Sequence, residues 1–452
     1  MSGSHEGKAC LIGLDLGTSA IKGVLTDAAG TVLAEAGAET SLLCPCEGWV
    51  EVDPERHYRN LCRIIRELAA KAPGEVAGLA MAAASGNTLL TGADGKPLTN
   101  IINWMDRRAE LNPPAALAGL TGDAVSQVTG WPCVTGFPLA HLAWLRENEP
   151  ERYQAAEHVG MDTDWVLYRL TGKWRMDHST ATTFHLQEQT SGTYYEPFLK
   201  RLGLVRERLS ELTESGTAVG PLTVRALSDT GLSPRTLAVA GCFDHPAAAR
   251  SVGVLEQGQL MLSCGTSWVG FAPHRKRQAV LDAKMLCDPF LSASTGVWGG
   301  MFSVPCVGRT IDWYVENVIA PGESDKLRIF DEAAAQAEPG ASGLIVDLRE
   351  PPQPIRASRA NLSRAVMEGA AWLLNEKVCE LKAQGFTYDR AVMVGGPSRS
   401  RVWTSIVANA TGLDILTHGR SAGARGAALL AGIGSGVYRD ERAALAGRGG
   451  LK

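Results

Sequence analysis

The sequence predicts an α/β protein built from two similar domains, and three observations lead to this expectation. The chain has 452 residues, which exceeds the usual size of one hydrophobic core, so two domains of roughly 200 residues each are expected. Short apolar stretches typical of buried strands alternate with longer stretches of helical periodicity. A strand–turn–strand pattern near the N-terminus recurs in the second half, which indicates an internal duplication.

Composition and charge narrow the class of protein. Hydrophobic residues make up 45% of the chain and charged residues 20%, as in a folded soluble enzyme. The formal net charge is −4 and the basic residues are scattered, so nucleic acid and anionic membranes are not expected as partners. The N-terminus has no apolar signal region and no stretch is long enough to span a membrane, so we expect a cytoplasmic protein.

The ten cysteines are mostly single residues in apolar surroundings, as expected for reduced core positions. Cys44 and Cys46 flank Pro45 without further ligands at the spacing of a zinc site. The cysteines expected in the core are Cys10, Cys62, Cys242, Cys264 and Cys379.

The stretch LIGLDLGTSAIKGVLTD, residues 11–27, predicts two strands joined by a tight turn at residues 17–19. Such a turn directs backbone N–H groups and the hydroxyls of Thr18 and Ser19 into one concavity, which suits phosphate oxygens. Asp15, at the end of the first strand, can hold a magnesium ion or its water. An ordinary hairpin with a turn-stabilising aspartate remains the alternative.

The stretch GQLMLSCGTSWVGFAP, residues 258–273, repeats this arrangement, with Gly265, Thr266 and Ser267 at the positions of residues 17–19. Ser263 stands at the position of Asp15. Two phosphate-binding turns with one metal-binding carboxylate would hold a nucleoside triphosphate in a cleft between two similar domains. The glycine patterns of P-loop and dinucleotide-binding folds are absent from the sequence.

Two further stretches carry candidate site residues. TLAVAGCFDHPAAAR predicts a strand that delivers Asp244 to its C-terminal end, where open α/β sheets place their chemistry, although a helix-capping role explains Asp244 equally well. PLTNIINWMDRRAE predicts a strand and loop that end in an exposed cluster suited to polyol recognition, with simple packing as the alternative. The cluster comprises Asn103, Trp104, Asp106 and Arg107.

Two more elements complete the pattern. Residues 54–72 predict a helix with Asp53 as N-cap, Pro54 at its first position and a core face that contains Tyr58. In YDRAVMVGGPSRSRVW, a strand is followed by Gly395 and Gly396, which permit the close approach of a flat ring or a phosphate to a positive-φ turn.

In this order, the stretches resemble the FGGY family of carbohydrate kinases, within the actin, hexokinase and heat-shock-chaperone superfamily of ATPases. The resemblance rests on eight blocks: GLDLGTSAIKGVLTD, GWVEVDPE, WMDRR, YRLTGKWRMDHSTAT, GCFDHPAAA, LSCGTS, RAVMEGAAW and VGGPSRSRVW. It implies two ribonuclease H-like domains from a duplication, and phosphoryl transfer from ATP with Mg²⁺ to a sugar. Residues 1–246 would bind the sugar and carry the first phosphate loop and the base, and residues 247–452 would carry the second loop and the nucleoside site.

The resemblance also assigns roles to individual residues. Asp15 resembles the magnesium-associated acid and Asp244 the general base, which would also contact the sugar. The first phosphate loop would use Thr18, Ser19 and Lys22, and the second Gly265 and Thr266. The nucleoside contacts would be Gly308, Gly396 and Ser400, and the sugar-side residues would be Ser85, Trp104, Asp106 and Arg107.

The acceptor loop departs from known relatives. Xylulose kinases carry Gln-Met-His-Gly where this chain has residues 83–86, so Ser85 replaces their histidine, and His245 stands where they usually have asparagine. The Arg-Glu pair of glycerol kinases is absent. The WMDRR stretch is nearer to the Trp-Met-Asp-x-Arg form of some ribulose and related pentulose kinases, so we expect a kinase for a ketopentose such as xylulose or ribulose. The alternatives are a polyol, hexulose or aldonic acid kinase, an inactive sugar-binding regulator, and an ATPase switch without a sugar; a homodimer is left open.

Overall fold

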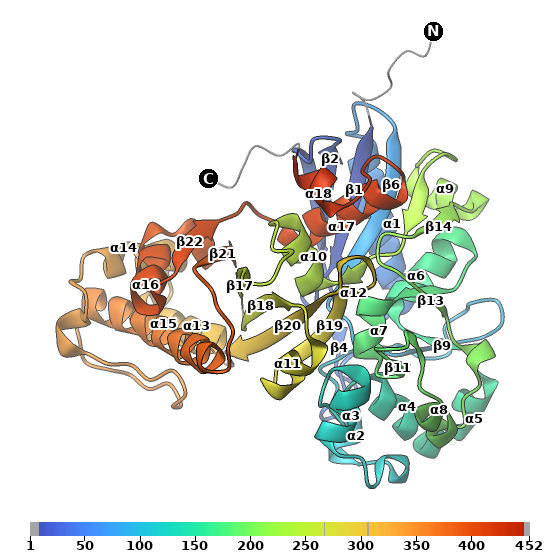
Figure 1. Cartoon of the computed structure of the whole chain (residues 1–452), viewed down its shortest axis with the longest axis horizontal. Coiled ribbons are helices and arrows are strands. Elements are labelled where there is room, and N and C mark those ends of the chain that lie inside the picture. The colour runs from blue at the N-terminus through green and yellow to red at the C-terminus, as the bar shows by residue number, and fades with distance from the viewer. Residues whose placement is uncertain (1–8, 266, 305–306, 447–452) are drawn as a thin grey trace. The chain divides into compact units, whose positions relative to one another are not determined.

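The computed structural model describes residues 9–265, 267–304 and 307–446. The chain forms two compact units. Within the described residues, the first unit contains residues 9–253, 286–298 and 421–446, and the second contains residues 254–285 and 299–420. A C-terminal segment thus returns to the first unit, where Figure 1 shows α17 (Ala422–Gly434) beside the N-terminal strands. The division into functional domains 1–246 and 247–452 stays a prediction.

A mixed sheet of seven strands forms the centre of the first unit. Its order is β14-β15-β6-β1-β2-β3, and β16 pairs with the end of β6. The β1–β2 and β2–β3 pairs are antiparallel, whereas β6 is parallel to β1, β15 and β16. The strands are β1 (Cys10–Leu16), β2 (Ala20–Asp27), β3 (Val32–Glu39), β6 (Val76–Ala83), β14 (Ala218–Pro221), β15 (Leu237–Val239) and β16 (Cys242–Phe243).

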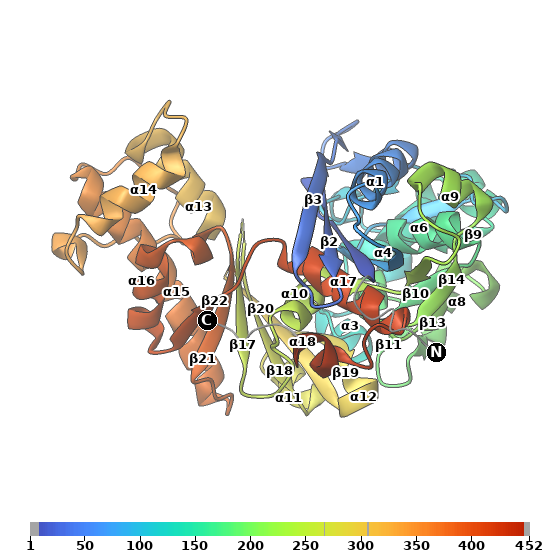
Figure 2. The same cartoon turned by 90° about the horizontal axis from the view of Figure 1, so that it is seen from above.

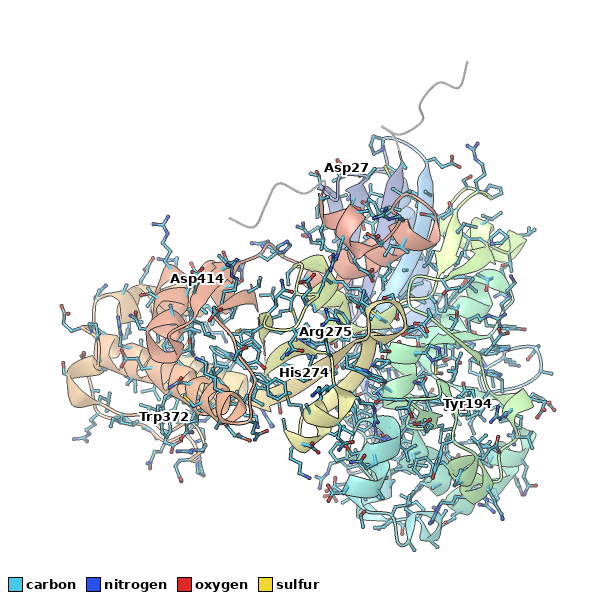
Figure 3. The ribbon with its side chains drawn as sticks, viewed as in Figure 1. Asp27, Tyr194, His274, Arg275, Trp372 and Asp414 are labelled. Atoms are coloured by element: carbon cyan, nitrogen blue, oxygen red, sulfur yellow. The ribbon has the colours of Figure 1, made fainter. Side chains whose placement is uncertain are left out.

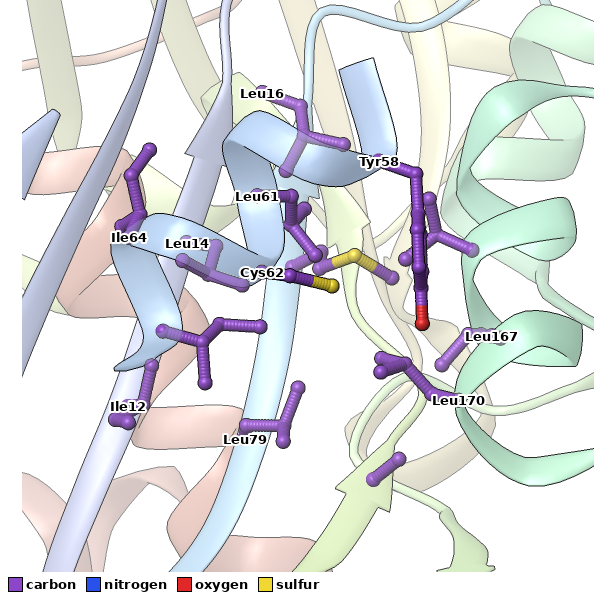
Figure 4. Packing of buried hydrophobic residues seen from close by; sticks show 14 of the residues in the cluster. Ile12, Leu14, Leu16, Tyr58, Leu61, Cys62, Ile64, Leu79, Leu167 and Leu170 are labelled. Carbon is purple, nitrogen blue, oxygen red and sulfur yellow. The ribbon is translucent and has the colours of Figure 1, made fainter. Parts of the chain in front are cut away.

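Helices cover both faces of this sheet. Because successive side chains of a strand point to opposite faces, Ile12, Leu14 and Leu16 of β1 pack on the side of α1 (Pro54–Ala69), as Figure 4 shows. Leu11 packs on the other side with residues of α17 and of α10 (Asp244–Ser251). Asp15, an odd-numbered residue of β1, therefore belongs to the α17 face.

The start of α1 is as the sequence predicts. Asp53 accepts a hydrogen bond from the Arg56 backbone N–H at 2.8 Å, and Pro54 occupies the first helical position. Tyr58, like the rest of the predicted core face, is buried against the sheet. The helix itself ends at Ala69, slightly before the predicted stop.

The rest of the first unit contains shorter elements. Its helices are α2 (Arg108–Leu111), α3 (Gly122–Thr129), α4 (Phe137–Asn148), α5 (Pro150–Ala155), α6 (Asp162–Thr171), α7 (His178–Phe184), α8 (Glu196–Leu202), α9 (Val224–Thr230), α12 (Ser292–Thr295) and α18 (Glu441–Ala446). Its small strands are β4 (Leu42–Leu43), β5 (Glu51–Val52), β7 (Leu89–Thr91), β8 (Ile101–Ile102), β9 (His158–Gly160), β10 (Arg175–Asp177), β11 (Gln187–Glu188), β12 (Thr193–Tyr194), β13 (Glu211–Thr213) and β19 (Leu286–Leu291).

The second unit repeats the same principle. Its strands belong to a six-stranded sheet of order β19-β20-β18-β17-β21-β22, in which the β17–β18 hairpin is antiparallel and β17, β21 and β22 are parallel. These strands are β17 (Leu260–Cys264), β18 (Trp268–His274), β20 (Val297–Val304), β21 (Arg390–Gly395) and β22 (Asp414–Thr417). The helices are α11 (Arg277–Asp282), α13 (Val307–Tyr314), α14 (Lys326–Ala335), α15 (Arg359–Ala383) and α16 (Arg401–Thr411).

Helices α14, α15 and α16 pack together beside this sheet, as Figures 1 and 2 show. Trp372 of α15 is exposed (Figure 3). The Arg349 guanidinium lies 4.7 Å from the centre of its ring. Cys379 is also exposed on α15, so its predicted core position is wrong: its neighbours Val378 and Leu381 are the residues that face inward. The other four cysteines predicted in the core are buried.

None of the helices in the described part of the chain is both long and apolar enough to cross a membrane.

Candidate active site

Two carboxylates lie at one edge of the first unit's sheet. Asp15 precedes the last residue of β1, and Asp244 directly follows β16. Strand β6 lies between them, because Ala83 pairs with Leu16 on one side and with Phe243 on the other. The carboxyl ends of these parallel strands are where an open α/β sheet places its ligands.

The electrostatics of Asp15 reflect this arrangement. The pKa of Asp15 is raised from 3.8 to about 7. The main cause is the loss of hydration, the second is the negative charge of Asp244, and the positive charge of Lys22 partly offsets both. Lys22 is the cross-strand partner of Asp15 on β2. The structure thus brings together the predicted metal ligand, the predicted base and one predicted phosphate-binding cation.

Asp244 does not cap the helix that it begins. The N-cap of α10 is Phe243, which makes no side-chain capping bond. The Asp244 Oδ1 accepts a hydrogen bond from the neighbouring His245 backbone N–H at 2.6 Å, and the Asp244 side chain is 26% exposed. A partly exposed carboxylate outside a cap is available to take a proton, so the capping explanation loses its structural basis.

The N-terminus of α17 packs directly against Asp15. A Cβ atom built on Gly423 would lie 2.7 Å from the Asp15 Oδ2, so only a glycine lets the helix approach this closely. The sequence analysis missed this contact. The small residues in SAGARGAALLAG, at residues 421–432, are the signal of close packing, but they do not reveal which strand the helix meets.

The first predicted phosphate turn is held from both sides. The Gly17 N–H donates to the Ala20 carbonyl at 3.1 Å, and the Thr40 hydroxyl and N–H donate to the carbonyls of Gly17 and Ser19. Thr18 accepts a hydrogen bond from the Trp104 indole N–H at 2.9 Å. Ser19, in contrast, is exposed, so a ligand could reach it.

The second turn is tighter than the first. Four residues separate the paired Leu16 and Ile21, whereas three separate Cys264 and Trp268, so the two hairpins match in sequence but differ by one residue in register. Gly265 is exposed and its N–H donates to the Ser267 carbonyl at 3.3 Å. Thr266 lies outside the described residues.

The predicted nucleoside contacts all belong to the second unit. Gly308 is buried in α13. Gly396 is exposed and follows β21; the positive φ of this turn is at Gly395, with a value of 98°, whereas the φ of Gly396 is −56°. The Ser400 hydroxyl caps α16 by accepting from the Trp403 N–H at 3.2 Å, and it also hydrogen-bonds Asp331.

The acceptor-side loop differs from the expected exposed cluster. Trp104 is 39% exposed and Arg107 is exposed, but Asn103 and Asp106 are buried. Arg107 is engaged with Glu110. The expectation of exposure for Asn103 and Asp106 is therefore wrong.

The second arginine of WMDRR, which the sequence analysis passed over, explains why Asp106 is buried. Arg108 is 3% exposed and donates from Nε to the Asp106 Oδ1 at 2.8 Å and from Nη2 to the Glu51 Oε1 at 2.6 Å. Its guanidinium lies 3.7 Å from the centre of the Trp49 ring. Asp106 also accepts from the Val50 N–H at 2.7 Å, so its carboxylate orders the loop.

Ser85 lies beside this loop in a buried position. Its hydroxyl donates to the Ala83 carbonyl at 3.1 Å. Close by, Asn87 accepts a hydrogen bond from the Trp104 N–H at 3.1 Å and donates to the Asp162 Oδ2 at 3.1 Å. Asn87 and Asp162 were not singled out from the sequence, because nothing in one sequence indicates that they meet.

The chain is similar to known carbohydrate kinases over nearly its whole length. A xylulose kinase of Bacillus subtilis (strain 168) is 27% identical over 451 residues, which cover 95% of this chain and 89% of that protein. An autoinducer-2 kinase of Salmonella typhimurium (strain LT2) is 26% identical over 471 residues, covering 95% and 86%. The crystal structure of a gluconate kinase from Lactobacillus acidophilus superposes with a TM-score of 0.86 at 21% identity, covering 98% of this chain and 93% of that one.

The match to solved kinase structures confirms the predicted two-domain α/β fold of the actin-like ATPases. The sequence models of the N-terminal and C-terminal domains of the FGGY family of carbohydrate kinases match residues 10–250 and 260–435. Since the two matches together span most of the sequence, the chain belongs to the FGGY family of carbohydrate kinases, phosphotransferases that act on sugar hydroxyl groups.

Proposed function

We propose that this chain transfers the γ-phosphoryl group of MgATP to a hydroxyl group of a ketopentose such as xylulose or ribulose. The observation that carries the proposal is the neighbouring pair of Asp15 and Asp244 at the carboxyl edge of the first unit's sheet. One carboxylate can accept a proton while the other binds a cation, and phosphoryl transfer to an alcohol needs both functions.

Asp244 is the proposed general base. A sugar hydroxyl is a poor nucleophile until its proton is accepted, and the partly exposed Asp244 carboxylate has no capping role that competes for it. Its accepted hydrogen bond from the His245 N–H holds one carboxylate oxygen and leaves the other for the acceptor.

The residues around Asp15 fit a divalent cation. Within the described residues no group of three or more His, Cys, Asp or Glu side chains is arranged to hold a metal by itself, so Mg²⁺ would be shared between Asp15 and the phosphates of ATP. A cation there would offset the repulsion between Asp15 and Asp244 that contributes to the raised pKa. Bound Mg²⁺ would neutralise charge that develops on the phosphate oxygens.

The remaining predicted residues bind and orient ATP in this proposal. Thr18, Ser19 and Lys22 contact phosphate oxygens from the first turn, and Gly265 and Thr266 do so from the second. Gly308, Gly396 and Ser400 contact the nucleoside. The open surroundings of Gly396, where an added Cβ would find no other atom within 4 Å, suit the close approach of a ring.

The ketopentose is preferred because the relatives that cover more than nine-tenths of this chain include two xylulose kinases, at 27% and 26% identity. Because one similar solved structure is a gluconate kinase, an aldonic acid is the alternative acceptor. The alternative function that is not enzymatic is an inactive sugar-binding regulator. On the acceptor side, Trp104 offers an exposed ring face, Ser85 a hydroxyl, and Arg107 a charge at the rim.

An ATP-consumption screen over pentuloses, hexuloses, polyols and aldonic acids tests the proposal. We expect turnover well above the sugar-free control for at least one pentulose, and loss of that excess in Asp244→Asn. If no acceptor raises ATP consumption while a sugar still binds in calorimetry, the protein is a regulator and the proposed function is wrong.

A further inference from the structure

A small polar pocket lies beneath the first turn, on the α1 side of β1. The pocket is partly open to solvent, and its interior has about 10 Å³ of space, which is room for about one water-sized group. Leu16 and Ala84 line it together with polar residues from three distant parts of the chain: Thr18, Thr40, His57, Asn87 and Asp162. Because Leu16 and Asp15 point to opposite faces of β1, this pocket is separate from the carboxylate pair.

Two polar groups in this pocket are buried without a partner. His57 Nε2 and Asp162 Oδ1 make no hydrogen bond, although the two residues are 6% and 3% exposed. The His57 Nε2 lies 3.9 Å from the Asp162 Oδ2, and that oxygen already accepts from the Asn87 amide. An unpaired buried donor or acceptor costs stability, so such groups usually have a partner that the protein alone does not supply.

The chemistry of the two groups defines the missing partner. A carboxylate oxygen only accepts hydrogen bonds, and a neutral imidazole nitrogen either donates or accepts. A hydroxyl group satisfies both at once and fits the water-sized space. Burial lowers the pKa of His57 and raises the pKa of Asp162, so burial disfavours the charged form of each group. The pair is neutral overall when it holds one proton and negative when it holds none, so it carries no net positive charge in either state. A carboxylate ligand would therefore meet no compensating charge there.

The pocket adjoins the proposed acceptor site. Ala84 and Asn87 follow the end of β6, and β16, which leads into Asp244, pairs with β6 at Ala83. Trp104 hydrogen-bonds to two lining residues, Thr18 through its indole N–H and Asn87 through its backbone N–H. A polyhydroxylated chain that lies against Trp104 thus has a hydroxyl-sized space next to it.

We propose that His57 and Asp162 form a specificity subsite that binds one hydroxyl group of the acceptor and favours neutral ketoses and polyols over aldonic acids. This inference rests on the proposed function, since it assigns a discriminating role to residues beside the same acceptor site. It adds a binding pair that acts on affinity and leaves the transfer step to Asp244.

Calorimetric binding of D-xylulose, D-ribulose, glycerol and D-gluconate, together with ATP turnover for each, tests the subsite. The variants are Asp162→Asn, which removes the charge but keeps the shape, and His57→Phe, which removes the unpaired nitrogen. Asp164→Asn is the matched control, because Asp164 lies two residues further along α6, is equally buried, and bonds instead to the Met161 N–H and Ser210.

We expect wild type to bind at least one neutral acceptor and to bind gluconate at least tenfold more weakly. Both variants should lose about tenfold in affinity for the neutral acceptor, and Asp162→Asn should also narrow the gap to gluconate. The kcat at saturating acceptor should stay within about threefold of wild type. Their melting temperatures should not fall, since His57→Phe removes a buried nitrogen that has no partner and Asp162→Asn keeps an oxygen that can accept from the Asn87 amide. The Asp164→Asn protein should keep its acceptor affinity even if it melts earlier.

The outcomes separate this subsite from the kinase proposal. If wild type turns over a neutral acceptor and both variants bind that acceptor within twofold of wild type, the pocket holds only a structural water and the subsite is wrong, while the kinase proposal stands. A preference for gluconate in wild type also overturns the subsite alone. If wild type binds and turns over none of the four, both proposals fail for these acceptor classes.

Discussion

Replacement of Asp244 by asparagine separates catalysis from stability more sharply than any other change in this chain. The amide keeps the size of the side chain, and its carbonyl oxygen can still accept from the His245 N–H. It cannot accept a proton from a sugar hydroxyl. Loss of a general base typically lowers the rate by about 10²- to 10⁴-fold, or roughly 3 to 5 kcal/mol in activation free energy, so kcat should fall by at least 100-fold.

Asp244→Asn should also be more stable than the wild-type protein at pH 8. The pKa of Asp15 is about 7 in the folded protein against an ordinary value of 3.8, so the unfolded chain loses this proton first, and the free energy of unfolding declines as pH rises from about 4 to 7. The negative charge of Asp244 is one cause of this shift. Without it the folded pKa of Asp15 falls, so Asp244→Asn should melt higher than wild type at pH 8 and equally at pH 4.

The assay combines steady-state kinetics with thermal melts at pH 4 and pH 8. Asp123→Asn is the control, because Asp123 is also an acidic residue in the first turn of a helix in the first unit, and it is exposed. It should keep both kcat and its melting temperature. If Asp244→Asn retains more than about a tenth of wild-type turnover, against the roughly 100-fold minimum for a lost base, Asp244 is not the base. A lower melting temperature at pH 8 would refute the electrostatic part of the reasoning.

Three further predictions concern the metal, the nucleotide and the loop. Asp15→Asn should raise the Mg²⁺ concentration that turnover requires. In the wild-type protein, the Mg²⁺ affinity should fall about tenfold per pH unit below pH 7, because protonated Asp15 is a poor ligand. Mg²⁺ titrations between pH 5.5 and 8 measure both effects. Gly396→Ala places a methyl group in space that the protein leaves open, so ATP affinity in calorimetry should fall at least tenfold with sugar affinity unchanged. Arg108→Leu should cost about 3 to 5 kcal/mol in urea unfolding because it leaves two buried carboxylates without their partner, whereas Arg107→Leu should leave the free energy of unfolding nearly unchanged because its ion pair with Glu110 is exposed.

Each of these has a result that would count against it. A Mg²⁺ titration of Asp15→Asn that matches wild type at every pH removes Asp15 from the metal site. Unchanged ATP affinity in a folded Gly396→Ala protein contradicts the nucleoside assignment; the melting temperature is the control, since Pro397 disfavours a side chain at the helical φ of Gly396. Equal unfolding free energies for the two arginine variants would show that the buried ion pairs of Arg108 do not hold the loop.

The sequence predicts those parts of the fold that neighbouring residues determine. The capped start of α1 depends on Asp53 and Pro54, which are adjacent, and the hairpin at residues 17–19 depends on one glycine and its flanking strands. The position of Asp244 at a strand end follows from a short apolar run before it. These features could be read without knowledge of distant contacts.

Contacts between distant segments decide the rest. Two adjacent arginines in WMDRR are equivalent in sequence, and Arg108 is the buried one because Glu51, far earlier in the chain, lies within 2.6 Å of it. The approach of Gly423 to Asp15 joins residues from opposite ends of the chain. The pairing of His57 on α1 with Asp162 on α6 likewise has no local signal, since a histidine on the buried face of a helix is ordinarily a core residue.

The end of β1 explains why recognition and catalysis should respond separately to mutation. Consecutive residues of a strand face opposite sides, so Asp15 turns toward α17 and the carboxylate pair, while Leu16 turns toward the pocket that contains His57 and Asp162. The backbone of one strand therefore lies between the groups proposed for proton and metal chemistry and those proposed for the acceptor. Asp162→Asn should consequently act on KM and Asp244→Asn on kcat, and their effects on activation free energy should add in the double variant, because the two side chains are proposed to contact different hydroxyl groups of the acceptor and lie on opposite sides of β1. Coupling above about 1 kcal/mol between these two sites would show that the strand does not insulate them.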